Sequence, residues 1–97
     1  MIRTFKNKAT EDIFNGKATR AAMRACLKKV WKIATRKLDQ LDSILSLDEL
    51  RVPPGNRLEI LSGQRKGQFS IRINDQSRIC FKWSETGPED VEITDYH

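Results

Sequence analysis

Three side chains able to handle protons, Asp95, Tyr96 and His97, follow one another directly after an alternating apolar and polar segment. Histidine titrates near neutral pH, whereas tyrosine and aspartate can donate, accept or orient a proton. A last residue is often frayed or left over from a purification tag, but a tag brings a run of histidines and this chain has one. Asp95, Tyr96 and His97 are therefore candidate catalytic residues.

Two segments, 69–73 and 77–83, alternate apolar and polar residues and predict β-strands with one apolar face each. Their apolar residues share a face only if a three-residue loop, 74–76, joins them, which pairs Ile71 with Ile79. The same register places Arg72 directly opposite Arg78 on the polar face. Like charges in this position destabilise a sheet unless an anion lies between them or both side chains extend into water. Both interpretations, a phosphate site and a solvated pair, stay open.

A third alternating segment, 91–94, is expected to pair beside the strand that carries Arg78. Its parity places Tyr96 on the arginine face and points Asp95 with the core residues, at the end of the sheet. The sequence offers no nucleophilic Ser or Cys beside a base and no phosphate-cradling glycine loop. The set fits phosphodiester cleavage in which the RNA 2′-hydroxyl is the nucleophile and the protein supplies base, acid and charge stabilisation.

The elements that must position this face fall into a helical half and a β half. The first five residues can form a short strand, and Thr10 can cap a short helix that Asn15 and Gly16 end. Apolar residues then recur at helical spacing and predict one amphipathic helix from Thr19 to about Leu41. Its apolar stripe consists of Met23, Leu27, Val30, Ala34, Leu38 and Leu41.

A short turn or helix over residues 42–50 and a proline-rich loop over 51–56 connect this helix to the β half. Three strands with one apolar face each predict an antiparallel meander that accepts the stripe of the helix. We expect a single α+β domain over residues 1–97, with the helices packed on one face of a small twisted antiparallel sheet.

Positive charge is concentrated in the first half of the chain. The net charge is +5. Residues 1–40 carry 11 Lys or Arg against 3 Asp or Glu, a balance of +8, and residues 41–97 carry 7 against 10, a balance of −3. Such clustering favours a polyanionic partner, although a solvated helix face is the alternative.

The composition excludes several classes. Charged residues make up 32% of the chain, the mean hydropathy is −0.59, and neither a membrane span nor a signal peptide is present, so we expect a soluble cytoplasmic protein. Cys26 and Cys80 lie far apart in the sequence, and we expect both to be small buried residues with free thiols in a reducing compartment. One histidine and no cysteine cluster make a zinc site improbable, and we expect no metal and no cofactor.

Five segments of the chain, 53–59, 61–63, 67–76, 78–81 and 91–97, resemble the HigB-like (host inhibition of growth) toxins of the RelE/ParE superfamily. The resemblance covers most of the chain and is densest from about residue 50 onward. It implies a RelE/ParE-like fold and a small toxin that cleaves mRNA in the A site of translating ribosomes without a metal. It also implies a helix-turn-helix antitoxin, HigA-like and encoded adjacently, through which the toxin would reach operator DNA.

The resemblance also implies roles for individual residues. Arg78 matches an arginine that contacts the scissile phosphate, and Asp95, Tyr96 and His97 match the C-terminal catalytic stretch. Glu59 stands where some members have a histidine, and a carboxylate can also act as a base. For RNA or phosphate binding we expect Arg57, Arg65, Arg72 and Lys82, and for contacts to ribosomal RNA Arg20, Arg24, Lys28, Lys29, Lys32 and Arg36.

Two other functions also fit the sequence. The superfamily includes inhibitors of DNA gyrase, for which the C-terminal groups would be dispensable. A plain nucleic-acid-binding module is the third hypothesis, weakened because the predicted polar face has few aromatic residues on which bases could stack.

Overall fold

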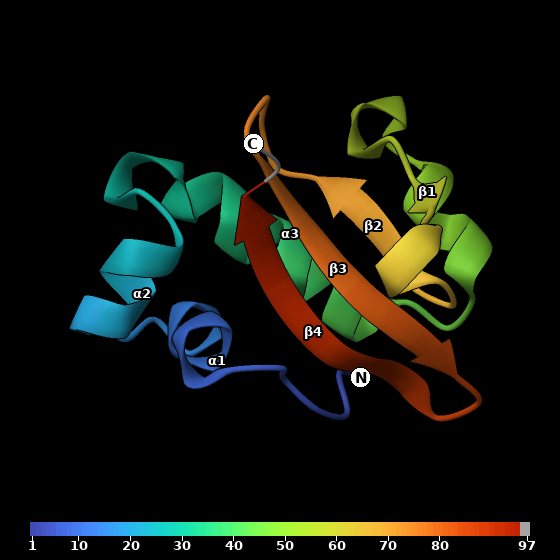
Figure 1. The fold of residues 1–97 in the computed structure, drawn as a ribbon, viewed down its shortest axis with the longest axis horizontal. Helices are drawn as coiled ribbons and strands as arrows, with labels where there is room; N and C mark the ends of the chain where they lie inside the picture. The colour runs from blue at the N-terminus through green and yellow to red at the C-terminus, as the bar shows by residue number, and fades with distance from the viewer. Residues whose placement is uncertain (96–97) are drawn as a thin grey trace.

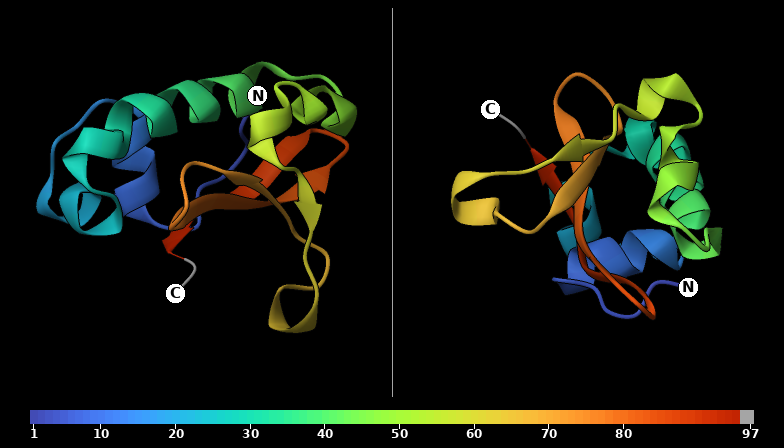
Figure 2. Two further views of the ribbon diagram at one scale, coloured as in Figure 1. Left: turned by 90° about the horizontal axis from the view of Figure 1, so that it is seen from above. Right: turned by 90° about the vertical axis from the view of Figure 1, so that its right-hand side faces the viewer.

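A computed structural model describes residues 1–95 and shows helices on one face of an antiparallel sheet (Figure 1). The strand order is β1-β2-β3-β4, so each strand pairs with its neighbours in sequence. Figure 2 shows α3 lying across one face of the sheet, with η4 projecting from the opposite face. The elements are α1 (Lys8–Phe14), α2 (Arg20–Ala25), η1 (Lys28–Val30), α3 (Trp31–Ser43), η2 (Leu47–Arg51), η3 (Pro54–Asn56), β1 (Glu59–Ile60), η4 (Gly63–Arg65), β2 (Phe69–Arg72), β3 (Ser77–Ser84) and β4 (Gly87–Asp95), where η denotes a 3₁₀ turn.

The predicted strand register is confirmed. Ile71 pairs with Ile79 and Arg72 with Arg78, and the backbone of Ile73 closes the loop by donating to the Ser77 carbonyl at 2.9 Å. The side chain of Asn74 shapes this loop, because its Oδ1 accepts from the backbone nitrogen of Ser77 at 2.7 Å. β4 lies beside β3 as expected. Alternation did not predict β1, since it has two residues and both are exposed.

The core lies between α3 and the sheet, as the two-layer prediction required. The inner face of the sheet buries odd-numbered residues on three strands, and α3 buries residues at intervals of three and four. Burial of this apolar surface is the main stabilising term of the domain. The apolar residues buried between the two layers include Ile71, Ile79, Phe81, Val91 and Ile93 from the sheet and Ala34, Leu38 and Leu41 from α3.

The prediction of one unbroken helix from Thr19 to Leu41 is wrong. The chain is extended at Cys26 (φ −158°, ψ 131°), and α2 ends there. This break changes which side chains face the core: Ala22 and Cys26 are buried, whereas Met23 and Leu27 are 46% and 59% exposed. From Val30 onward the apolar stripe is buried as predicted.

The first five residues do not form the regular short strand that the sequence predicted. They run beside β4 and form one isolated parallel bridge, between Phe5 and Val91. Arg3 and Lys6 donate backbone hydrogen bonds to the carbonyls of Pro88 and Val91, at 2.8 and 2.9 Å. These bonds cover the outer edge of β4, which would otherwise expose unpaired backbone groups.

The first helix begins earlier than predicted, and its cap is Asn7 instead of Thr10. Thr10 is fully buried, and its hydroxyl accepts from the backbone nitrogen of Ile93 at 3.0 Å. This residue therefore links α1 to β4. The predicted end of the helix at Asn15 and Gly16 is confirmed, with Gly16 at φ +74°.

The connection to the β half consists of short 3₁₀ turns. α3 continues through Ser43, so the predicted turn or helix from residue 42 corresponds only to η2. The proline-rich loop contains one further turn, η3, which ends at the buried Asn56. Within residues 1–95, no helix combines the length and the apolar character that crossing a membrane would require.

Candidate functional site

Arg78 lies on the central strand β3 with its guanidinium held by the protein. Only 7% of the residue is exposed. Its Nε donates to Ser70 Oγ at 2.8 Å, and its Nη2 donates to the Arg57 carbonyl at 2.6 Å. Both acceptors are uncharged, and the two bonds fix the orientation of the guanidinium. The interpretation in which Arg78 extends into water is therefore wrong.

A cavity of about 250 Å³ opens in front of Arg78 and is the candidate functional site. Glu59 Oε1 lies 3.7 Å from Arg78 Nη2, and the Arg72 guanidinium forms an ion pair with Asp75. Three guanidinium groups and two carboxylates thus surround one small space. We call this cavity the arginine pocket; its lining residues are Arg57, Glu59, Arg72, Asn74, Asp75 and Arg78.

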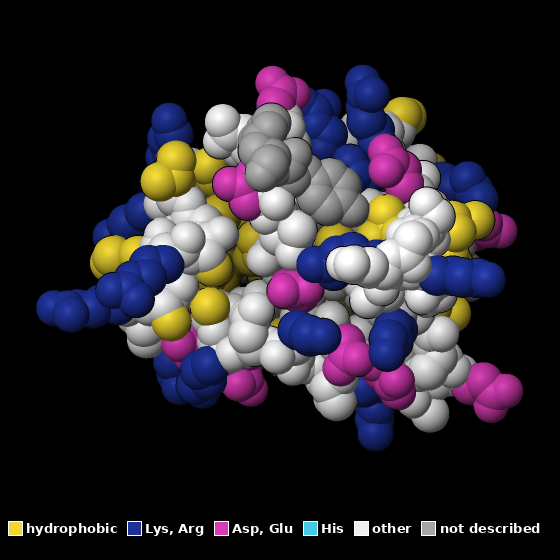
Figure 3. Space-filling model, in the orientation of Figure 1, with side chains coloured by type: hydrophobic (Ala, Val, Ile, Leu, Met, Phe, Trp, Pro, Cys, Tyr) yellow, Lys and Arg dark blue, Asp and Glu magenta, His cyan; other side chains and the backbone are white. Residues whose placement is uncertain are grey.

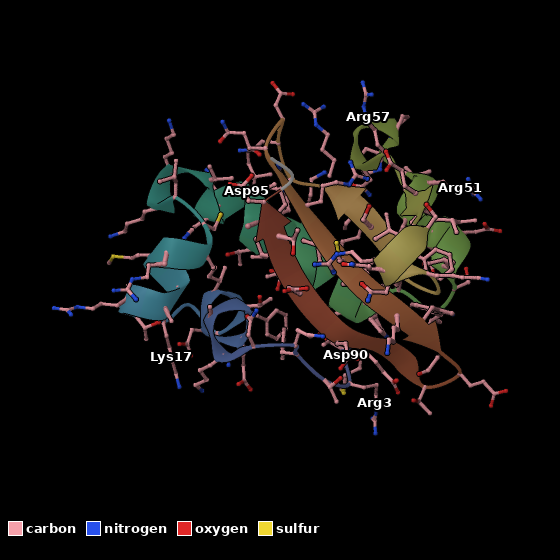
Figure 4. The ribbon with its side chains drawn as sticks, in the orientation of Figure 1. Arg3, Lys17, Arg51, Arg57, Asp90 and Asp95 are labelled. Carbon is pink, nitrogen blue, oxygen red and sulfur yellow. The ribbon has the colours of Figure 1, made fainter. Side chains whose placement is uncertain are left out.

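The segment before β1 forms one wall of the arginine pocket. Arg57 adopts a left-handed backbone conformation (φ 45°, ψ 60°), which directs its carbonyl to Arg78. Its side chain is exposed at the rim, near the top of the view in Figure 4. Asn56, fully buried, accepts from Lys37 Nζ at 2.7 Å and so connects this wall to α3.

The pKa of Lys37, on α3, is affected by burial and by arginines that include two of the pocket, Arg72 and Arg78. Partial burial lowers its pKa below the ordinary value, and the positive charges of Arg36, Arg72 and Arg78 lower it further. Arg36, Arg72 and Arg78 therefore contribute positive potential at the Lys37 ammonium. Such a potential favours a bound anion.

Two of the residues predicted to bind phosphate do not line the arginine pocket. Lys82 forms an ion pair with Asp90 at 3.4 Å, in the half of β4 remote from Asp95 (Figure 4). Arg65 extends from η4 across the sheet and donates to Glu92 at 3.1 Å and to Thr94 at 3.4 Å. Because Thr94 pairs directly with Arg78, Arg65 lies on the same face of the sheet as the pocket.

Asp95 lies on the other side of the sheet from the arginine pocket, as its parity predicted. It lines a second cavity, of about 260 Å³, together with Arg24, Cys26 and Leu27 from the helical layer. This position suits anchoring more than contact with a substrate at Arg78. Tyr96 and His97, the other two candidates from the C-terminal motif, lie outside the described residues.

Six basic residues of the helical layer are all exposed, but they do not form one face of one helix. They are distributed over α2, η1 and the first half of α3, because the chain bends at Cys26. Figure 3 shows Lys and Arg side chains along the left rim, with hydrophobic side chains between them. We call this surface the basic patch: Arg20, Arg24, Lys28, Lys29, Lys32 and Arg36.

Sequence reasoning missed three residues that support the pocket: Lys37, Asn56 and Ser70. Ser70 alternates onto the arginine face, and its parity with Arg72 could have identified it. Nothing in the local pattern distinguishes Asn56 or Lys37, since their contacts join segments 19 residues apart. Among residues 1–95, no group of three or more His, Cys, Asp or Glu residues is arranged to hold a metal ion.

The fold defines the structural class of the protein. It resembles the structure of the YoeB–YefM complex from Staphylococcus aureus, with a TM-score of 0.61 at 15% sequence identity, over 100% of this chain and 98% of the other. Helices on one face of a four-stranded antiparallel sheet match the RelE-like toxin fold. The predicted α+β architecture is thereby confirmed.

The sequence then defines the family. Residues 3–97 match the model of the RelE-like toxin of the type II toxin–antitoxin system HigB, so the chain belongs to the HigB-like toxin family. The Toxin HigB-1 of Vibrio cholerae is 52% identical over 48 residues, which are 50% of this chain and 50% of that protein. An uncharacterized protein of Haemophilus influenzae is 37% identical over 54 residues, 56% of this chain and 54% of the relative. The chain thus spans about half the length of the curated relatives it matches.

Proposed function

We propose that this toxin is an endoribonuclease that cleaves mRNA in the A site of translating ribosomes and so inhibits translation. The observation that carries the proposal is the arginine pocket. A buried, oriented Arg78 lies beside Arg72 and Glu59 in a cavity of about 250 Å³. A phosphoryl group that gains negative charge in its transition state is stabilised best by cations already held in place.

In the proposed reaction the RNA 2′-oxygen attacks the adjacent phosphorus and the bond from phosphorus to the 5′-oxygen breaks. The products are a 2′,3′-cyclic phosphate and a 5′-hydroxyl. One group must take the proton of the 2′-hydroxyl, and another must give a proton to the leaving 5′-oxygen. We assign these transfers to His97, Tyr96 and Glu59, the orientation of the C-terminal residues to Asp95, and charge stabilisation to Arg78 with Arg72; no metal ion takes part.

The basic patch is proposed to bind ribosomal RNA. Its six cations are exposed and none of them lines the arginine pocket, which suits non-specific attraction to phosphates. The rim residues Arg57 and Arg65 are proposed to guide mRNA phosphates toward Arg78. The site of action would be the cytoplasm, where the ribosomes are.

A helix-turn-helix antitoxin encoded beside the toxin is the proposed protein partner. The family assignment to a type II toxin–antitoxin system supports this partner, and the structural neighbour is itself a complex, YoeB–YefM. Contact with operator DNA would pass through the antitoxin. Co-expression with the adjacent gene should yield a stable complex on size-exclusion chromatography, and two separate peaks would contradict the assignment.

The activity is tested by adding purified protein to mRNA in a translating extract and to the same mRNA without ribosomes. Cleavage is expected only with ribosomes, and the upstream fragments should end in 2′,3′-cyclic phosphate. Equal cleavage of free RNA would contradict the dependence on ribosomes. Intact mRNA combined with inhibited DNA supercoiling would favour a gyrase inhibitor.

A further inference from the structure

Asn56 is a buried polar residue that the proposed chemistry does not use. Its side chain is completely shielded, yet every polar atom of it has a partner. Nδ2 donates to Gln40 Oε1 at 3.0 Å, to the Leu50 carbonyl at 3.1 Å and to the Val52 carbonyl at 3.4 Å. Oδ1 accepts from Lys37 Nζ at 2.7 Å. One amide thus joins α3, η2 and the proline-rich loop.

The backbone that follows Asn56 has a conformation that needs support. Arg57 has φ 45° and ψ 60°, a left-handed conformation that is uncommon for a residue with a side chain. Its nitrogen donates to the Pro54 carbonyl at 3.1 Å. Such a conformation persists only where the surroundings determine it, and the buried amide of the preceding residue attaches this segment by four hydrogen bonds.

The same backbone conformation aims a carbonyl at the pocket. The Arg57 carbonyl accepts from Arg78 Nη2 at 2.6 Å, on one side of the guanidinium, and Ser70 Oγ accepts from Nε at 2.8 Å. If Arg57 relaxed toward a right-handed or extended conformation, its carbonyl would turn and this attachment would be lost. Of these two hydrogen bonds, only the one to Ser70 on β2 would then remain.

We propose that Asn56 is a positioning residue for Arg78, acting through the carbonyl of Arg57. The positioning is a property of the free protein; only its effect on cleavage depends on the proposed function. Lys37 and Gln40 extend this support to α3, so the orientation of the pocket arginine is coupled to the helix that carries part of the basic patch.

The first measurement is the Nε–H signal of Arg78 in a ¹⁵N–¹H NMR spectrum, assigned by its absence in Arg78→Lys. In Asn56→Ala this signal should move and exchange faster with solvent. Ile13→Ala serves as a control. Ile13 is buried in α1 and takes part in none of the hydrogen bonds that join Asn56, Arg57 and Arg78 to their partners. Ile13→Ala should lower stability while leaving the Arg78 signal in place. An unchanged signal in Asn56→Ala would overturn the proposal, whether or not the protein proves to be a nuclease.

The second measurement is a double-mutant cycle in the ribosome assay. Asn56→Ala should lower the single-turnover cleavage rate by about 10²-fold, the cost of a misplacement near 1 Å, without changing the concentration needed for half saturation. In an Arg78→Ala background the same substitution should cost less than about 2-fold, because its target is gone. Equal costs in the two backgrounds would contradict positioning.

A milder variant keeps the proposal testable if Asn56→Ala does not fold. Gln40→Ala removes one acceptor of the Asn56 amide and the donor to the Val52 carbonyl, at 2.7 Å, but leaves the two backbone acceptors. It should move the Arg78 Nε–H signal in the same direction and by less. A signal identical to that of the wild-type protein would overturn the coupling.

Discussion

Arg78 in the arginine pocket and Arg24 in the basic patch are both arginines, but they lie in different environments. Arg78 is 7% exposed and bonded to Ser70 and Arg57, whereas Arg24 projects from α2 into solvent. A charge in water is screened within about 10 Å at moderate salt, and its side chain must be ordered whenever it binds. The orientation of Arg78 is already fixed when a substrate arrives.

The difference supports separate roles for the two regions in the proposed cleavage. The arginine pocket can stabilise charge that develops during a reaction, because the buried Arg78 guanidinium is already oriented. The basic patch can attract a large polyanion and release counterions, which raises affinity and makes it salt-dependent. Net charge alone, which is +5 for the whole chain, cannot separate these roles.

The largest effect is expected from His97. If it transfers a proton, His97→Ala should lower cleavage by about 10²- to 10⁴-fold, the usual contribution of a general acid or base. The loss should appear in the single-turnover rate and should not depend on salt. His97 would then act on the chemical step, as proposed for the arginine pocket, and not on affinity. Single-turnover cleavage of mRNA on translating ribosomes measures this loss, and full activity would leave Tyr96 and Glu59 as the proton-transfer candidates.

Arg78→Ala should lower the single-turnover cleavage rate by about 10²- to 10³-fold, the cost of removing one oriented donor from a developing anion. Unlike a surface arginine it should also cost stability, about 1–3 kcal/mol, because the buried Ser70 hydroxyl and the Arg57 carbonyl lose their donor. Urea unfolding measures the second effect.

Arg78→Lys is the matched control for this substitution. It keeps the charge but removes the two-pronged donor, so it should recover little of the cleavage rate. Activity close to that of the wild-type protein in Arg78→Lys would show that charge alone suffices.

Arg24→Ala should act on affinity instead of rate. Loss of one phosphate contact should reduce the slope of log affinity against log salt concentration by about one unit. The rate at saturation should stay within about 2-fold of the wild-type rate. Ribosome cosedimentation at several salt concentrations gives the slope. An unchanged slope would remove Arg24 from the proposed ribosome contact.

Lys37 lies between the two regions and should give the smallest effect, visible in pH dependence. Its pKa in the folded protein is lowered by burial first and by Arg36, Arg72 and Arg78 after that, so between this pKa and the ordinary 10.5 the unfolded chain binds more protons. Stability should therefore rise with pH in that window. Relative to Lys37→Met, the wild-type protein should gain a small amount of stability as pH increases toward 10.5, because Lys37 is partly exposed and water screens the charges that act on it.

The measurement for Lys37 is the difference in unfolding free energy between the two proteins at several pH values, which cancels the other titrating groups. A difference that falls with pH would contradict the sign of the shift. Loss of the bond to Asn56 Oδ1 makes Lys37→Met less stable at every pH and does not affect this test.

Periodicity predicted β2, β3 and β4 because apolar residues alternate onto the face of each strand that packs in the core. The opposition of Arg72 and Arg78 followed from parity alone, and the structure has that register. Periodicity failed at Cys26, where the stripe continued in the sequence although the chain bends. There Ala22 and Cys26 replace Met23 and Leu27 in the core, and a four-residue spacing fits both choices equally well.

The environment of Arg78 could not be predicted from sequence. Parity places the side chain on a face but does not reveal that a distant segment brings a carbonyl to within 2.6 Å of it. That contact depends on Asn56 and on the left-handed backbone of Arg57, and each requires tertiary packing. The sequence therefore predicted Arg78 as a site residue but not its burial or its hydrogen bonds.

One assay compares the arginine pocket and the basic patch directly. Single-turnover cleavage of mRNA on translating ribosomes is measured against toxin concentration for the wild type, for Arg78→Ala and for Arg24→Ala combined with Lys28→Ala. Arg78→Ala should lower the rate at saturation and leave the half-saturating concentration unchanged, whereas the double variant should do the reverse. A saturating rate that survives loss of Arg78, or that falls with the exposed pair, would contradict a catalytic arginine pocket.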